Sequence, residues 1–222
     1  IMAIENSIAG SILPNLGILH NSRLQVTGEY YLHIRQNLMA LPGVGLEGIE
    51  EVHSHPMALL QCVDFLDTHR WRLVETEDTA LSARRIAERG IRNAAAIAGD
   101  LAAELFGLEI VAADIHSIRN NYTRFLVLRP DHQPIDERSD KASLCFKTDH
   151  RHGSLIRVLR EMEDSTINMT KLQSSPIPSE PWHYMFHVDM EFACMDDYNR
   201  VIERMRSVTS ELHVYGVYRK GQ

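Results

Sequence analysis

A strand that leads directly into a capped helix is the feature that most restricts the fold of this chain. Residues 72–76 form an apolar and β-branched run, which predicts a strand. Asp78 or Thr79 then caps a helix, and Gly90 ends it, because glycine readily adopts the left-handed conformation found at helix ends. A strand, a turn and a helix in this order are typical of an α/β domain.

The same succession recurs immediately afterwards. Asn93 precedes the alanine-rich segment 94–105, whose composition predicts a helix, and Gly107 follows that segment. Strands are predicted at 110–113 and 123–128. We therefore expect an α/β domain with helices on the faces of a sheet, and ligands bound where strands end and helices begin.

The earlier part of the chain fits the same architecture. Residues 25–34 are rich in β-branched and aromatic side chains and predict a strand or hairpin. Ser54 is expected to cap a helix that carries Pro56 near its first position and continues to Leu66. The helix starts at Ser54 and Thr79 are thus placed on the expected binding face.

A second domain is predicted after a linker. Residues 130–140 are polar, contain Pro134 and lack periodicity, which separates a first domain of 1–129 from a second domain of 141–222. The second domain is predicted to contain a strand (143–147), a helix (153–162), two strands (166–172 and 182–191), a helix (196–207) and a strand (211–218). This β-α-β-β-α-β order predicts a ferredoxin-like antiparallel sheet with two helices on one face.

Charge and cysteine content argue against several classes of protein. The 30 acidic and 23 basic side chains give a net charge of −7, which disfavours nucleic acid and anionic membranes as partners. No apolar run approaches the roughly 20 residues that span a bilayer. The three cysteines, Cys62, Cys145 and Cys194, are far apart, so neither a disulfide framework nor a zinc site is expected and a cytoplasmic location fits best.

Four segments resemble the prephenate dehydratase family, in the family's order and at about its spacing. They are ENSIAGS (5–11), SHPMALLQC (54–62), AAIAGDLAAELFGL (95–108) and NYTRF (121–125). Two further segments resemble the effector-binding motifs of the family's ACT domain, GSLIRVL (153–159) and INMTKLQSSP (167–176). The resemblance therefore extends over nearly the whole chain.

The resemblance implies both a fold and an activity. It implies a two-lobed catalytic region, similar to type II periplasmic binding proteins, followed by an ACT domain, with assembly into a homodimer or homotetramer. The implied reaction converts prephenate to phenylpyruvate, with the loss of water and carbon dioxide, and requires no cofactor. The family carries further residues before the ENS motif, and the apolar opening at 1–4 suggests the middle of a strand. We therefore expect sequence upstream of Ile1, without which the first lobe would be incomplete.

The resemblance also assigns residues to the reaction. Thr123 takes the catalytic role of the family's T-R-F threonine, and we expect its hydroxyl to orient and stabilise the leaving oxygen, because threonine is a very weak acid. Arg124 is expected on the opposite face of its strand, where it would support the lobe instead of touching substrate. Glu5 is expected to be neutral or to pair with a donor that orders its loop. The candidate substrate-binding residues are Asn6, Ser7, Ser11, Ser54, His55, Thr79, Asn121, Arg124 and Phe125.

L-phenylalanine is the effector that the resemblance implies. Gly153, Ser154 and Leu155 match the glycine-initiated helix start of the effector motif, and Asn168 matches an asparagine on the next strand. The family's Glu-Ser-Arg-Pro is replaced at 173–176 by Gln-Ser-Ser-Pro, which removes both charged side chains. An ACT domain kept mainly for dimerisation is the alternative.

Other functions stay open at this point. Arogenate, the transaminated analogue of prephenate, is the nearest alternative substrate. A non-catalytic amino-acid sensor and a periplasmic solute-binding protein are alternatives of a different class. No metal is expected at His53 and His55, because no carboxylate or cysteine cluster lies near them in the sequence.

Overall fold

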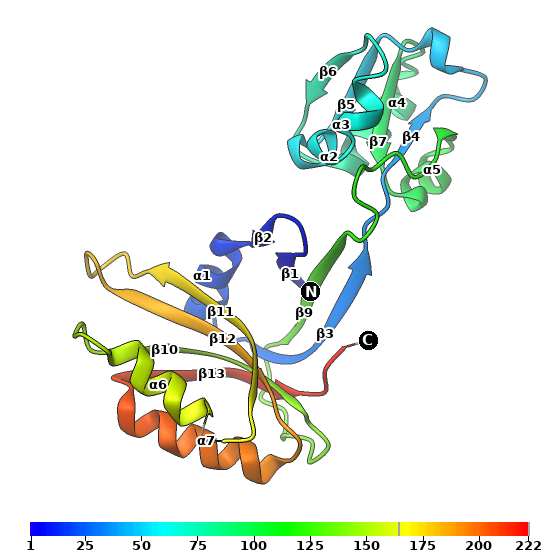
Figure 1. The fold of residues 1–222 in the computed structure, drawn as a ribbon. Helices are drawn as coiled ribbons and strands as arrows, with labels where there is room; N and C mark the ends of the chain where they lie inside the picture. The colour runs from blue at the N-terminus through cyan, green and yellow to red at the C-terminus, as the bar shows by residue number, and fades with distance from the viewer. Residues whose placement is uncertain (164, 222) are drawn as a thin grey trace. The chain divides into compact units, whose positions relative to one another are not determined.

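The structure is a computed structural model that describes residues 1–163 and 165–221, and it divides into two compact units. Unit 1 comprises residues 1–32 and 122–222, and unit 2 comprises residues 33–121. Unit 2 is therefore an insertion between two segments of unit 1, so the chain passes from one unit to the other twice (Figure 1). None of the helices in the described part combines the length and apolar character that a bilayer crossing needs.

The first sheet of unit 1 has four strands in the order β2, β1, β9, β3. β1 runs antiparallel to both β2 and β9. Helix α1 (Leu13–Asn21) follows β2 and buries Leu16 and Leu19 in the core beside the sheet. The strands are β1 (Met2–Asn6), β2 (Gly10–Ser11), β3 (Gln25–His33) and β9 (Tyr122–Arg129).

The second sheet of unit 1 is antiparallel, in the order β11, β12, β10, β13. Helices α6 and α7 cover one face of it, where Val158, Val201 and Met205 are fully buried (Figure 1). The order β10, α6, β11, β12, α7, β13 confirms the predicted β-α-β-β-α-β succession. The elements are β10 (Lys141–Lys147), α6 (Ser154–Glu163), β11 (Asn168–Pro176), β12 (Tyr184–Glu191), α7 (Met195–Val208) and β13 (Glu211–Tyr218).

The other face of the second sheet packs against the first sheet. Val26 and Leu126 of the first sheet share one buried cluster with Cys145 and Tyr215 of the second. Unit 1 therefore has three layers, namely the first sheet, the second sheet and the helix pair. Residues 130–140 connect β9 to β10 and so join the two sheets within this unit.

Unit 2 is built on a five-stranded sheet in the order β6, β5, β7, β4, β8, with helices on both faces. β5 is parallel to β6 and β7, whereas β4 is antiparallel to β7 and β8. Its strands are β4 (Asn37–Ala40), β5 (Glu51–Ser54), β6 (Arg72–Glu75), β7 (Ala94–Ala98) and β8 (Glu109–Ala112). Its helices are η1 (Leu46–Gly48), α2 (Pro56–Gln61), α3 (Val63–Leu66), α4 (Thr79–Arg89) and α5 (Asp100–Phe106).

Two predicted helices in unit 2 differ from the structure. The segment 94–105 is not one helix, because Ala94–Ala98 forms the fully buried central strand β7 and only the residues from Asp100 onward are helical. The predicted helix through Leu66 is broken at Cys62 into α2 and α3. The α/β architecture with helices on both faces and the glycine stops at Gly90 and Gly107, both with positive φ, are confirmed.

Candidate active site

Asn6 and Thr123 meet across the antiparallel pair of β1 and β9. The two residues are register partners, and Asn6 Nδ2 donates a hydrogen bond to Thr123 Oγ1 at 3.1 Å. The same amide nitrogen lies 3.2 Å from the carbonyl oxygen of Tyr122. Because the Thr123 hydroxyl accepts from Asn6, its own hydrogen is oriented away from that amide and is available to donate.

The turn after β1 is organised by the same asparagine. Asn6 Oδ1 accepts hydrogen bonds from the backbone N–H groups of Ile8 and Ala9, at 3.0 and 2.9 Å. Ser7 binds the start of β9 twice, since its N–H donates to Tyr122 O at 2.8 Å and its Oγ accepts from Tyr122 N at 2.9 Å. The predicted residues Asn6, Ser7 and Thr123 thus form one hydrogen-bonded group where β1 ends and β9 begins.

The remaining predicted residues near β9 lie in different environments. Ser11 on β2 pairs with Glu5 on β1, and the partner of Glu5 on β9 is Arg124, not Thr123. Phe125 is half-buried two positions after Thr123, so strand alternation puts it on the same face. Asn121 belongs to unit 2, is fully buried, and its carbonyl accepts from Ile34 N at 2.7 Å.

Arg124 points to the other face of β9, as the alternation predicts. Its side chain is only 6% exposed and forms ion pairs with Glu29 on β3, at 2.6 Å, and with Asp189 on β12. Burial by itself would lower the pKa of Arg124, but Asp189 and Glu29 raise it above its ordinary value, so the guanidinium stays charged. Arg124 is therefore engaged in the interior of unit 1.

Glu5 has the partner that the sequence suggested. Its carboxylate lies 2.9 Å from Lys171 Nζ on β11 and 3.8 Å from Arg124 Nη1. The paired alternative for Glu5 therefore holds, and its donor comes from the second sheet.

Ser54 lies at the end of β5 but does not cap α2. Its hydroxyl is fully buried and donates to the carbonyl of Ile97 on β7 at 2.7 Å, which ties neighbouring parallel strands together. His55 is the actual N-cap, because its Nδ1 accepts from Met57 N at 3.2 Å.

His53 pairs with Glu51 at 3.0 Å, so the two histidines have separate partners. In the described part of the chain, His, Cys, Asp and Glu side chains form no group suited to a metal ion.

Thr79 is the first residue of α4, and Asp78 is its N-cap. Asp78 Oδ1 accepts from Leu81 N at 2.8 Å, so this member of the predicted pair carries out the capping. The helices α2, α4 and α5 follow β5, β6 and β7, and β5 is parallel to both β6 and β7. The starts of these helices consequently lie together at the carboxyl ends of β5, β6 and β7, where backbone N–H groups favour anions.

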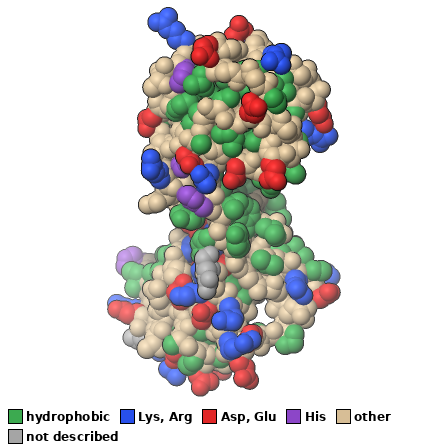
Figure 2. Space-filling view, turned by 90° about the vertical axis from the view of Figure 1, so that its right-hand side faces the viewer, with side chains coloured by type: hydrophobic (Ala, Val, Ile, Leu, Met, Phe, Trp, Pro, Cys, Tyr) green, Lys and Arg blue, Asp and Glu red, His purple; other side chains and the backbone are tan. Residues whose placement is uncertain are grey.

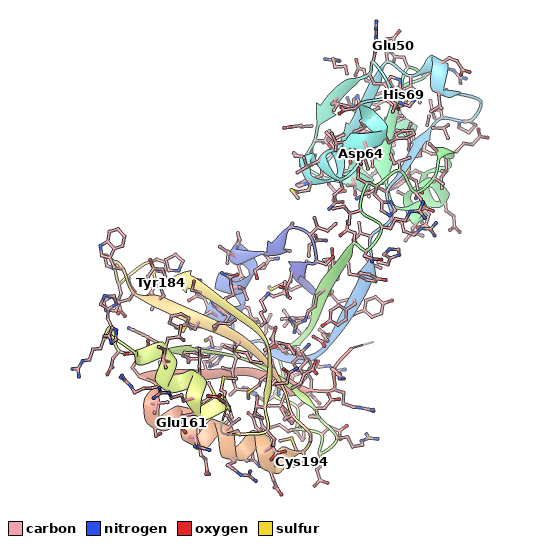
Figure 3. All side chains as sticks on the ribbon, in the orientation of Figure 1. Glu50, Asp64, His69, Glu161, Tyr184 and Cys194 are labelled. Atoms are coloured by element: carbon pink, nitrogen blue, oxygen red, sulfur yellow. The ribbon has the colours of Figure 1, made fainter. Side chains whose placement is uncertain are left out.

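The predicted effector residues only partly converge. Gly153 has a φ of +76° and precedes α6, and a cavity of about 370 Å³ lies beside Ser154 and Leu155. Asn168 is exposed at the start of the edge strand β11 and is not among the residues that line this cavity. Tyr184, labelled in Figure 3, marks the hairpin side of the cavity, whose lining also includes Thr148, Asp149, His150, Arg151, His152, His183 and Phe186.

Sequence reasoning missed the charged side chains buried between the two sheets of unit 1. Glu29, Lys141 and Asp189 are each at most 8% exposed in their side chains. Asp189 follows the apolar run of β12 and Glu29 precedes two tyrosines on β3, and a charge inside such a strand is the signal that would have indicated a buried partner. Elsewhere, Figure 2 shows acidic and basic side chains interspersed over the visible face, which gives no extended field of one sign there.

The sequence model of the family described as prephenate dehydratase matches residues 1–133. The bifunctional chorismate mutase/prephenate dehydratase of Neisseria gonorrhoeae is 38% identical over 221 residues, which cover 97% of this chain and 60% of that protein. The chloroplastic arogenate dehydratase/prephenate dehydratase 2 of Arabidopsis thaliana is 34% identical over 229 residues, covering 98% of this chain and 60% of that protein. The chain thus spans 60% of the length of each relative.

Two solved structures have similar folds. GqqA, described as a novel type of quorum quenching acylase, superposes with a TM-score of 0.89 at 26% identity, covering 99% of this chain and 81% of that chain. The prephenate dehydratase of Arthrobacter aurescens, in complex with L-Phe, superposes with a TM-score of 0.86 at 27% identity, covering 98% of this chain and 73% of that chain. The two structures are about equally similar to this chain, so fold likeness alone does not separate their activities.

Proposed function

The chain belongs to the prephenate dehydratase family, and we propose that it catalyses the decarboxylating dehydration of prephenate to phenylpyruvate. The observation that carries this proposal is the hydrogen-bonded pair of Asn6 and Thr123, which joins two of the family's motifs in one small group. The family match and the curated relatives favour this activity over an acylase.

The reaction requires positioning more than strong acid–base chemistry. The bond from the ring to its carboxylate breaks to release carbon dioxide, its electron pair enters the ring, and the C4 hydroxyl leaves as water after taking up a proton. Aromatisation drives these steps, so no electron sink is required and we propose no cofactor. Thr123 accepts from Asn6 and donates its own hydrogen to the departing oxygen, which stabilises the charge that develops there.

Each unit, taken by itself, carries donors that we propose as substrate-binding groups. His55 and Thr79 lie at the starts of α2 and α4, where backbone N–H groups and the helix dipole favour anions. Ser7 and Ser11 supply further hydroxyls near β1. We propose a supporting role for Ser54, because its hydroxyl already donates to Ile97 O. A two-lobed catalytic region of the periplasmic-binding-protein kind is consistent with the insertion of unit 2 into unit 1.

The experiment that tests this proposal is turnover by the protein made from its complete reading frame. Thr123→Val keeps the side-chain shape and removes the hydroxyl, so kcat should fall by about 10²–10³-fold, as when one preorganised donor is lost. Thr123→Ser should retain most of the activity. A Thr123→Val enzyme with the wild-type kcat would show that the hydroxyl is not used.

Arogenate is the second candidate substrate, because the Arabidopsis relative is named for both activities. Comparing kcat/KM for prephenate and arogenate decides between them. A strong preference for arogenate would replace the first assignment while keeping the same site.

We further propose that residues 141–222 form an ACT domain that binds L-phenylalanine and reduces turnover. Support comes from the β-α-β-β-α-β order, the positive φ of Gly153 before α6, and the L-Phe complex of the Arthrobacter enzyme. Cytoplasmic location and a homodimer or homotetramer complete the proposal. Calorimetry with L-phenylalanine, beside the phenylpyruvate assay, tests it: heat without turnover would favour a non-catalytic sensor, and turnover without heat would favour a domain kept for assembly.

A further inference from the structure

Among the residues that the structure describes, three ion pairs join the first sheet of unit 1 to the second. In each pair one side chain comes from the first sheet and the other from the second. The pairs are Arg124 with Asp189, Glu29 with Lys141, and Glu5 with Lys171. Three positive and three negative charges are therefore brought together at one interface.

These charges lie in an interface that is otherwise apolar. The neighbouring residues Ile4, Leu126 and Tyr215 are nearly fully buried. Lys171 is 8% exposed in its side chain, and its only ion pair within the described residues is with Glu5, at 2.9 Å. A buried ammonium with one counter-ion constrains the position of that counter-ion strongly, because separating the two would leave a charge unpaired in an apolar setting.

The first-sheet members of this network lie directly beside the candidate active site. Glu5 and Arg124 are register partners on β1 and β9, and the next register pair is Asn6 with Thr123. Successive side chains on a strand point to opposite faces, so fixing Glu5 and Arg124 on one face fixes the direction of Asn6 and Thr123 on the other. A β-bulge between Ala3 and Glu5 shifts the pairing of β1 with β9, so the register of Glu5 and Asn6 differs from that of the residues before the bulge.

The second-sheet member Lys171 lies on the edge strand β11. This strand also carries Asn168, three residues earlier, and the altered segment 173–176 that begins two residues later. A shift of β11 along or away from its neighbour would therefore move the Lys171 ammonium, and with it the Glu5 carboxylate.

We propose that Lys171 is a positioning residue, which acts through Glu5 to hold the Asn6–Thr123 hydrogen bond in its productive geometry and transmits displacement of β11 to that bond. This inference rests on the proposed role of Thr123. It adds the route by which the second sheet controls the hydroxyl. No other described ion pair joins the effector strand β11 to the first sheet.

The clean test is Lys171→Met in the protein from its complete reading frame. Glu5 is 34% exposed in its side chain and lies 3.8 Å from Arg124, so this change strands no buried charge. We expect kcat for phenylpyruvate formation to fall about tenfold, since small displacements of positioned groups cost that much or more. KM should stay within about twofold, because no substrate contact is removed. Lys171→Arg keeps the ion pair and should restore most of the wild-type kcat.

The second readout is the response to L-phenylalanine, measured as the ratio of kcat without and with the amino acid. In Lys171→Met this ratio should approach one, although calorimetry should still show L-phenylalanine binding. A merely structural role for Lys171 would lower thermal stability but leave this ratio as in the wild type.

The matched control is Arg204→Met, which removes a cation of similar size from the same unit. Arg204 on α7 pairs with Glu161 on α6 at 2.7 Å, and Figure 3 labels Glu161 on the helix side of the second sheet. It should leave both kcat and the L-phenylalanine ratio unchanged. Equal losses in Lys171→Met and Arg204→Met would overturn the proposal, because general destabilisation would then explain them.

The outcomes also separate this inference from the proposed function. If Thr123→Val is inactive while Lys171→Met keeps the wild-type kcat and ratio, the positioning role is wrong and the proposed function stands. If Thr123→Val is fully active, the role of the Thr123 hydroxyl is wrong and the inference fails with it, although the dehydratase activity stands. If the wild-type protein forms no phenylpyruvate, the proposed function fails. Should Lys171→Met not fold, Glu5→Gln, which keeps the shape of the side chain, is measured instead: reduced kcat and ratio support the role, and wild-type values overturn it.

Discussion

Gly216 on β13 lies where the backbone of the second sheet of unit 1 comes very close to the backbone of the first. Of all the glycines, it leaves the least room for an added Cβ. A Cβ added there would lie 1.9 Å from the carbonyl oxygen of Val26 on β3, and 2.7 Å from its carbonyl carbon. Both neighbours are backbone atoms, which cannot rotate away as a flexible side chain would. Gly216→Ala should therefore force the sheets apart.

The size of the effect follows from this geometry. Ordinary Cβ contacts begin near 3.4 Å, so the Val26 carbonyl would have to retreat by about 1.5 Å. A gap of 0.5–1 Å already removes a quarter to a half of a dispersion contact, and the same interface buries Leu126 and Tyr215. Overpacking together with lost contacts predicts a decrease of about 3–5 kcal/mol in the free energy of unfolding.

Urea unfolding followed by circular dichroism measures this decrease, and Gly28→Ala is the matched control. Gly28 lies on the same strand as Val26, and its added Cβ would meet only the Val127 side chain at 3.9 Å. That variant should change the free energy of unfolding by less than about 1 kcal/mol. If Gly216→Ala were as stable as Gly28→Ala, the close approach of the two sheets would be refuted.

Three further perturbations probe stability in both units. Burial, with the nearby charges of His20 and Lys171, lowers the pKa of His187 from 6.5 to about 4. As the pH falls, His187 is protonated in the unfolded chain before it is protonated in the folded protein. The contribution of His187 to the free energy of unfolding should therefore be complete above pH 6.5 and fall by up to about 3 kcal/mol towards pH 4. Urea unfolding of His187→Gln should show a weaker pH dependence than the wild type, and an equal pH dependence would contradict the lowered pKa. Ser54→Ala should cost about 1–3 kcal/mol in thermal unfolding, because the carbonyl of its partner on β7 loses a buried donor. Asp78→Ala should cost about 1 kcal/mol through the lost N-cap, whereas Asp78→Ser should be nearly neutral.

The part of the fold after residue 140 followed from the sequence because its elements carry strong local patterns. Tyr198, Val201, Ile202 and Met205 have the spacing of one helix face, and all four are buried on α7. Alternating strands of ordinary length flank that helix. Local pattern and tertiary packing therefore point to the same structure.

The segment 94–98 shows where local propensity fails. Alanine favours helix in isolation, but Ala94–Ala98 lies between β5 and β4 in the centre of the unit 2 sheet and is fully buried on both faces. Small side chains let helices α4 and α5 pack closely against that strand. Tertiary packing thus outweighed a preference of a few tenths of a kcal/mol per residue.

The candidate site was predictable in part, for a related reason. The hydrogen bond between Asn6 and Thr123 joins residues more than a hundred positions apart, and only the resemblance of both motifs to one family placed them together. The ion pairs of Glu29 and Asp189 with Arg124 carry no motif, so their partners required the coordinates. The capping error at Ser54 was one of a single position, and nothing in the sequence indicated it, because histidine is not among the residues that favour N-caps.

Strand alternation explains why a threonine and an arginine stand next to each other at this site. A hydroxyl is directional only if the backbone beneath it cannot rotate, and pairing with β1 and β3 alone would leave β9 free to twist with its sheet. Thr123 faces the Asn6 amide, while Arg124, one residue later, is held by Glu29 and Asp189 from two different sheets. The arginine thereby removes the rotation that would misdirect the hydroxyl. For this reason Arg124→Met should reduce turnover, although the buried Arg124 side chain does not contact substrate. Asp189→Ala, which removes the carboxylate that the second sheet supplies to Arg124, should reduce turnover in the same way.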